Sequence, residues 1–247
     1  MNKILFPKIT FLLLLLIPLT FFGFNPTYFS KLLSTDIVYH AHAVFMLLWV
    51  AMAIVQPLLI HKKKTALHKT VGKASYVIMP MVFITSYLII KHTYYNFINT
   101  RVVEAQQSAE VFTLDQLNVM AASYVMIGVV YIIWLFVFYL LAVLNRKKIV
   151  HHSTFMFAAI LTLLGPTIDR IMYQVTMLFG GSFNVFVENA VFALNLTILT
   201  ALFFYQKRKG TNFKPALIAL CFYALGIAGY HLLPKTIMWS NFISSIL

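Results

Sequence analysis

The sequence has little charge and almost no cysteine. Of its 247 residues, 10% are charged and 61% belong to the apolar set. Soluble proteins average about 25% charged and about 45–50% apolar residues. A soluble domain with so few charges could not cover its own surface, so the composition indicates a chain embedded in lipid. The single cysteine, Cys221, excludes a disulfide framework and any zinc or iron–sulfur site built from several cysteines.

Several catalytic motifs are also missing. The sequence contains no HExxH, GxSxG or CxxC pattern and no glycine-rich phosphate loop. These absences exclude P-loop nucleotide hydrolysis and zinc-peptidase chemistry of the usual helical type. Two classes of function remain. The first is a cofactor protein with histidine ligands, and the second is a small-molecule transporter or a non-catalytic accessory subunit of a membrane complex. A membrane hydrolase with a His/Asp metal site is a weaker third alternative.

Apolar runs long enough to cross a bilayer dominate the chain. A helix needs roughly 20 apolar residues to cross a hydrocarbon core of about 30 Å. The sequence therefore predicts an all-α membrane protein with seven transmembrane helices, folded as a single polytopic domain over residues 1–247. The predicted spans lie near residues 9–25, 38–60, 74–91, 115–144, 153–178, 184–206 and 214–233.

The first of these runs also resembles a signal peptide, because Lys3 and Lys8 precede the apolar residues 11–17. A small-residue cleavage site does not follow, and Phe21 is a poor substitute for one. We therefore expect a retained anchor, with cleavage as the alternative.

The basic residues separate between the two sets of loops. Alternation through seven spans places fourteen basic residues and no acidic residue on one face, and five basic residues with all six acidic residues on the other. The positive-inside rule then places the N-terminus in the cytoplasm and the C-terminus outside. The fourteen residues are Lys3, Lys8, Lys62, Lys63, Lys64, Lys69, Lys73, Arg146, Lys147, Lys148, Lys207, Arg208, Lys209 and Lys214.

This separation also explains the net charge of +13, which would otherwise suggest nucleic acid as a partner. The basic residues lie in short turns that flank the spans, and no basic groove is interleaved with stacking aromatic residues. We therefore expect contact with anionic lipid headgroups at the cytoplasmic face and no binding of nucleic acid. The sequence carries no information about protein partners.

Polar side chains inside the predicted spans are candidates for function, because burying an ionisable group in a bilayer costs roughly 2.5–3.5 kcal/mol even on lenient scales. On the second span, His42, Trp49 and Gln56 recur every seven residues and therefore share one helix face. On the sixth span, Glu188 and Asn195 share a face in the same way. An amide as deep as Asn195 normally forms a hydrogen bond to another helix.

Charged residues also gather near one end of spans five and six. We expect Asp169, Arg170 and Glu188 to form a cluster of ion pairs there. Such a cluster either joins the two helices or binds a substrate.

All eight histidines lie near the ends of spans, where haem or a metal could bind. Bis-histidine haem needs two imidazoles at one depth on facing helices. The set near the basic loops offers His68 with His151 or His152, and the opposite set offers His42 with His92 or His231. Ordinary interfacial histidines are the alternative. The candidate cofactor ligands are His42, His68, His151 and His152, and the candidates for a divalent metal are His42, Asp169, Glu188 and His231.

A longer pattern resembles a widespread family of uncharacterised bacterial multi-pass membrane proteins. The match covers roughly residues 38–172 and departs from the family where Ser153 and Thr154 replace the basic residue that usually follows the histidine. It leaves open whether His151 or His152 is the equivalent position. The matching residues are His40-Ala-His-Ala, Trp49, Gln56-Pro-Leu-Leu, Leu67-His68-Lys-Thr-Val-Gly72-Lys, His151-His152-Ser153-Thr154-Phe155-Met156 and Arg170.

The resemblance implies a bacterial inner-membrane protein and points to His42, His68, His152 and Arg170 as the positions to test. It carries no established activity, and its likeness to cytochrome b-type haem bundles is distant. From the helix-end histidines we expect a histidine-ligated protein, with haem b or a divalent metal, that takes part in membrane electron transfer.

Overall fold

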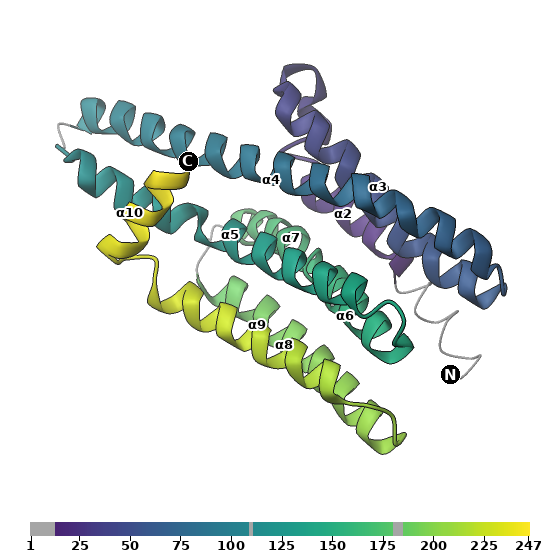
Figure 1. Ribbon diagram of the computed structural model, residues 1–247. Coiled ribbons are helices and arrows are strands. Elements are labelled where there is room, and N and C mark those ends of the chain that lie inside the picture. The colour runs from purple at the N-terminus through teal and green to yellow at the C-terminus, as the bar shows by residue number, and fades with distance from the viewer. Residues whose placement is uncertain (1–12, 109–110, 180–184) are drawn as a thin grey trace. The chain divides into compact units, whose positions relative to one another are not determined.

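The computed structural model describes residues 13–108, 111–179 and 185–247, with the backbone alone for 185–187. In this part of the chain every regular element is a helix (Figure 1). The elements are α2 Leu16–Phe24, the 3-10 helix η1 Phe29–Ser34, α3 Ile37–His61, α4 Thr65–Ser108, α5 Leu114–Leu144, α6 Ile149–Leu161, α7 Leu164–Leu178, α8 Val185–Arg208, α9 Lys214–Leu232 and α10 Ile237–Ile246.

Six helical stretches among the described residues are long and apolar enough to cross a membrane, so the protein is a multi-pass membrane protein. They are Ile37–His61, Thr65–Ser108, Leu114–Leu144, Ile149–Leu178, Glu188–Arg208 and Lys214–Leu232. These stretches match the second to seventh predicted spans. The first predicted span, 9–25, begins outside the described residues, and its described part contains α2. Seven spans and the orientation of the termini stay predictions.

The helix that contains the third predicted span is much longer than that span. The predicted span ends at residue 91, whereas α4 continues to Ser108 and has 44 residues. Hydropathy falls after Lys91, but residues 92–108 contain neither glycine nor proline, so nothing in the sequence ends the helix there. Hydropathy therefore indicates the apolar part of this helix but not the residue at which the helix ends.

The chain forms two compact units, each assembled from two separate segments. The first unit, unit 1, contains residues 1–87 and 164–191, and the second, unit 2, contains residues 88–163 and 192–247. Helices α4 and α8 each contribute to both units. A single domain over residues 1–247 stays a prediction.

The fifth span is interrupted. Helix α6 ends at Leu161 and α7 begins at Leu164, so the break precedes Pro166 by a few residues. The proline ring has no N–H and clashes with the carbonyl four residues earlier, which belongs to Thr162. The chemistry of Pro166 thus accounts for the break at residues 162–163.

In unit 1, α2 packs closely against α7. A Cβ atom added at Gly23 would lie 2.8 Å from the backbone oxygen of Thr167, so the two helices approach more closely than a side chain at this position would allow. The Gln174 amide Nε2 donates to the backbone oxygens of Phe22 and Gly23, at 3.1 and 3.0 Å. The second half of α7 is therefore held against the end of α2.

The core of unit 2 is aromatic. Trp134 on α5 is 1% exposed and lies against Tyr223 of α9, with the ring centroids 4.2 Å apart. Its indole Nε1 donates to the backbone oxygen of Phe222 at 3.2 Å, and the Tyr223 hydroxyl donates to that of Ala158 at 3.3 Å. These contacts join α5, α6 and α9. The aromatic face of α9 therefore serves packing.

Candidate functional site

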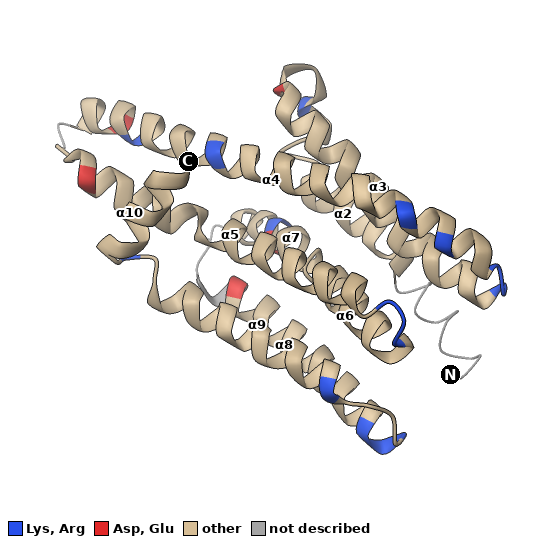
Figure 2. Ribbon diagram, viewed as in Figure 1, with Lys and Arg blue, Asp and Glu red and all other residues tan. Residues whose placement is uncertain are grey.

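Most basic residues of the described chain lie in or next to the loops that the sequence analysis assigned to one face. Figure 2 shows blue ribbon at the turn between α3 and α4, at the turn between α5 and α6, and at the end of α8. The other basic residues, which lie elsewhere, are Lys31, Lys91, Arg101, Arg170 and Lys235. The acidic residues of the described chain lie elsewhere, toward the opposite ends of the helices that carry them. The candidate site residues form groups at the helix ends near the basic turns and at the helix ends that carry the acidic residues.

In unit 1, His42 of α3 lies beside Thr85 of α4. The distance between His42 Nδ1 and Thr85 Oγ1 is 3.1 Å. The Thr85 hydroxyl has a single proton, which it donates to the backbone oxygen of Met81 at 2.7 Å. When this proton is on the Met81 oxygen, the hydroxyl accepts from His42, so that Nδ1 carries the imidazole proton and Nε2 keeps its lone pair. In this tautomer Nε2 is the nitrogen that can accept a hydrogen bond or bind a metal.

The neighbouring histidine, His40, is used differently. Its Nδ1 lies 2.9 Å from the Tyr28 hydroxyl, and the two rings meet edge to face. His40 thus joins α3 to the segment that precedes it, and only His42 takes part in the contact with α4. Two residues along a helix point in nearly opposite directions, which accounts for the difference.

Arg170 of α7 lies in the same unit. Its guanidinium carbon is 4.4 Å from the centre of the Phe24 ring, and Nη1 donates to the backbone oxygen of Pro166 at 2.8 Å. Arg170 and His42 are also near enough to interact electrostatically. The structure thus brings together two residues that the family pattern singled out.

Asp169 and Glu188 are likewise close enough for their charges to interact. The expected neighbourhood of these two carboxyl groups at the ends of spans five and six is therefore present in unit 1. The ion pairs expected from them stay a prediction.

Gln56 and His68 meet at the other end of the α3–α4 pair. Gln56 Nε2 donates to the backbone oxygen of His68 at 3.3 Å, and it also lies 3.6 Å from the position that a Cβ atom would take at Gly72 of α4. Trp49 is buried on the same face of α3. The predicted stripe of His42, Trp49 and Gln56 is thus the face of α3 that packs inward.

In unit 2, His152 at the start of α6 is anchored as His42 is. Its Nδ1 lies 2.9 Å from the backbone oxygen of Ala142 on α5. A carbonyl oxygen only accepts, so Nδ1 carries the proton and Nε2 keeps its lone pair. The adjacent His151 instead places its ring edge to face with Phe155. His152 therefore has the geometry of a ligand position.

Asn195 departs from the expected arrangement. It is fully buried in α8, yet neither its Nδ2 nor its Oδ1 has a hydrogen-bond partner within the described chain. The expected hydrogen bond to another helix is absent from that part of the structure. His231, a candidate metal ligand, is exposed at the end of α9 and lies against the rings of Phe192 and Tyr230.

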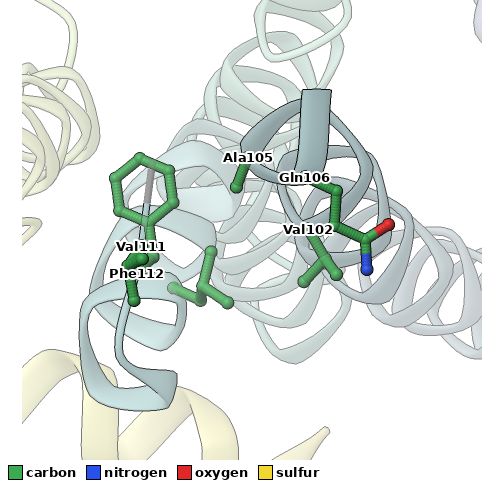
Figure 3. A pocket seen from close by; sticks show the side chains of 6 residues that line it. Val102, Ala105, Gln106, Val111 and Phe112 are labelled. Carbon is green, nitrogen blue, oxygen red and sulfur yellow. The ribbon is translucent and has the colours of Figure 1, made fainter. Parts of the chain in front are cut away.

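Metal-ligating side chains do not gather in larger groups. In residues 13–108, 111–179 and 185–247, three or more His, Cys, Asp or Glu side chains are nowhere arranged to hold a metal ion. The four-residue metal set from the sequence stays a prediction. The open hollow between the end of α4 and the start of α5 is apolar and contains none of the candidate residues (Figure 3); it is lined by Val102, Ala105, Gln106, Val111, Phe112 and Leu117.

The sequence analysis did not identify three polar residues that form hydrogen bonds between helices: Thr85, Thr154 and Gln206. Thr85 anchors His42, and Thr154 forms a buried hydrogen bond with Gln206. Thr85 lies 43 residues from His42 on another helix, so no periodic signal relates the two. Gln206 directly precedes the basic residues that end α8, where the sequence suggests only a membrane boundary.

No protein-family model matches the sequence, and neither a curated protein nor a solved structure is similar to it. The resemblance noted from the motif residues therefore stays a prediction.

Proposed function

We propose that the chain is a bacterial inner-membrane protein in which His42 and His152 bind haem or a divalent metal through Nε2 and serve electron transfer. The observation that supports this proposal is the hydrogen bond from each Nδ1. In metal and haem sites the second imidazole nitrogen is held in this way, which fixes the tautomer and orients the ring. His42 is held by Thr85 and His152 by the oxygen of Ala142.

The protein supplies few ligands to each proposed haem or metal. One histidine is proposed as a ligand in each unit, His42 in unit 1 and His152 in unit 2, so water or substrate would fill the remaining positions. Haem iron or a borderline metal accepts imidazole nitrogen, whereas the carboxyl groups of Asp169 and Glu188 favour a harder cation. Arg170, beside His42, favours a bound group that carries negative charge.

An absorption spectrum of the purified protein in detergent, oxidised and then reduced with dithionite, tests the proposal together with elemental analysis. We expect either haem bands or a stoichiometric metal. His42→Ala should remove the haem or metal that binds at His42 and should lower the measured content accordingly. The matched variant His40→Ala should retain it. A protein with neither haem nor stoichiometric metal would contradict the proposal.

The role of the Thr85 hydroxyl can be tested separately. Thr85→Val removes the acceptor for His42 Nδ1 at nearly constant volume, and loss of such an outer partner typically weakens metal binding about 10–100-fold. Thr85→Ser keeps the hydroxyl and should bind as the unmodified protein does. Equal affinities in the two variants would show that the hydrogen bond does not orient His42.

We further propose seven spans, with the N-terminus in the cytoplasm and the C-terminus outside. The support is the separation of fourteen basic residues from all six acidic ones. We expect a fluorescent protein fused to the N-terminus to be bright and alkaline phosphatase fused to the C-terminus to be active. Loss of the N-terminal fusion from the membrane fraction would indicate cleavage, and a bright fluorescent fusion at the C-terminus would contradict the orientation. In this orientation the fourteen basic side chains face anionic headgroups.

A small-molecule transporter is the second candidate. The specific observation that favours it is the break between α6 and α7 midway along a membrane-spanning stretch, because interrupted helices commonly form substrate sites in transporters. Absence of both haem and metal from the purified protein would favour this candidate over the first.

A further inference from the structure

Two buried amides lie on one face of α8. Asn195 is 0% exposed and Gln206 is 6% exposed, although both belong to a helix that otherwise buries apolar side chains. They are eleven residues apart, which is three helical turns and about 16 Å along the axis. Leu199 is fully buried between them on the same face. The face that contains these three residues is called the amide face below.

Hydrogen bonding along the amide face is incomplete. Gln206 Nε2 lies 2.7 Å from Thr154 Oγ1 on α6, while Oε1 has no partner among the described residues. Turning the amide over would exchange the two atoms and leave the nitrogen unpaired instead. Asn195 lacks a described partner at both atoms. Buried amides without hydrogen bonds are rare in folded proteins, and each one calls for a polar partner.

The amide face points into unit 2 rather than toward lipid. Gln206 is bonded to α6, and Phe192, one turn from Asn195, lies against the rings of Trp134 and Tyr230 on α5 and α9. Lipid therefore cannot supply contacts to these amides, and lipid tails offer no hydrogen bonds in any case. At the other end, Gln206 adjoins the basic turn Lys207–Lys209, which is exposed.

We propose that the amide face of α8 lines a file of internal water that runs from the basic end of the helix to Asn195. Water is the partner that buried amides take when no protein group is near, and a water molecule with such partners makes about three hydrogen bonds. Gln206 and Thr154 form the entrance, and Asn195 ends the file in the interior of unit 2. The proposal uses none of the histidines assigned to a cofactor, so it stands independently of the proposed function.

Cysteine accessibility tests the proposal, because the chain has a single cysteine. In a Cys221→Ala background, Asn195→Cys and Leu199→Cys place a thiol on the amide face. Ala219→Cys on α9 is the matched control, because Ala219 is also 0% exposed and lies only five residues after the start of its helix. The probe is a small anionic methanethiosulfonate, which reacts with the thiolate in water and does not dissolve in the bilayer.

We expect the thiols at 195 and 199 to react at least ~10-fold faster than the thiol at 219 in the folded protein, because the reaction requires water at the thiolate. Leu199→Cys retains Asn195, so it tests the file even where the substitution of the amide itself disturbs folding. All three thiols should react alike after denaturation. Reaction at 195 and 199 as slow as at 219 in the folded protein would overturn the proposal.

Discussion

Gly226→Ala is expected to destabilise the detergent-solubilised protein strongly, by at least ~2 kcal/mol, because overpacking a rigid core forces side chains and backbone apart. The added Cβ would lie 2.5 Å from Cε2 and 2.7 Å from Cζ2 of Trp134, and both distances are too short for non-bonded carbon atoms. Trp134 cannot turn aside, because its indole is bonded to the oxygen of Phe222 and packed on Tyr223. Thermal unfolding followed by size-exclusion chromatography measures the effect.

Gly229→Ala is the matched control on the same helix. A Cβ at this position would meet Leu233 at 3.8 Å and Met126 at 4.0 Å, which are ordinary contacts. Alanine is the better helix former, so this variant should be as stable as the unmodified protein or more so. The cost of Gly226→Ala should also shrink when Trp134→Phe is present, because the two sites are in contact. Equal melting temperatures for the two single alanine variants would contradict the packing described for α5 and α9.

Gly23→Ala is expected to have the second large effect, in unit 1. The new Cβ would lie 2.8 Å from the backbone oxygen of Thr167, and a backbone atom cannot yield as a flexible side chain does. Two hydrogen bonds from Gln174 hold the same end of α2 against α7, so relief of the clash would also weaken them. We expect a loss of about 1–3 kcal/mol and faster proteolysis of the segment between α2 and α3.

The comparison for this variant is Gly72→Ala, also in unit 1. Its Cβ would lie 3.6 Å from the nearest atom, Gln56 Nε2, so the methyl group fits without movement. Melting temperature and proteolysis rate should both stay near those of the unmodified protein. If Gly23→Ala behaves as Gly72→Ala does, then α2 does not pack on α7 as closely as described.

Parts of the fold that depend on local composition could be predicted from the sequence. The second span was placed within one residue at each end, because Asp36 caps the helix start and the Lys62–Lys64 turn follows its last apolar residues. The break near Pro166 follows from the chemistry of proline alone. The extension of α4 beyond residue 91 could not be predicted from hydropathy, since a helix continues through polar residues when nothing breaks it.

For the candidate site, the sequence predicts which residues share a helix face but not which residues of other helices they contact. Seven-residue spacing correctly placed His42 and Gln56 on the inward face of α3. The partner of His42 could not be found, because Thr85 comes from another helix and a threonine within an apolar run gives no signal of its own. The reverse happened at Asn195, where a partner was expected and the described chain supplies none.

Helix α4 is longer than its apolar part requires for crossing a membrane. Its 44 residues extend about 66 Å along the helix axis, more than twice the thickness of the hydrocarbon core. The polar part of α4 carries contacts suited to water, including an ion pair between Arg101 and Glu104 at 2.9 Å and the stacking of Arg101 on Phe97. The polar residues 92–108 thus continue the same helix that carries the third apolar stretch, and they add charged side chains to it without a turn between the two parts.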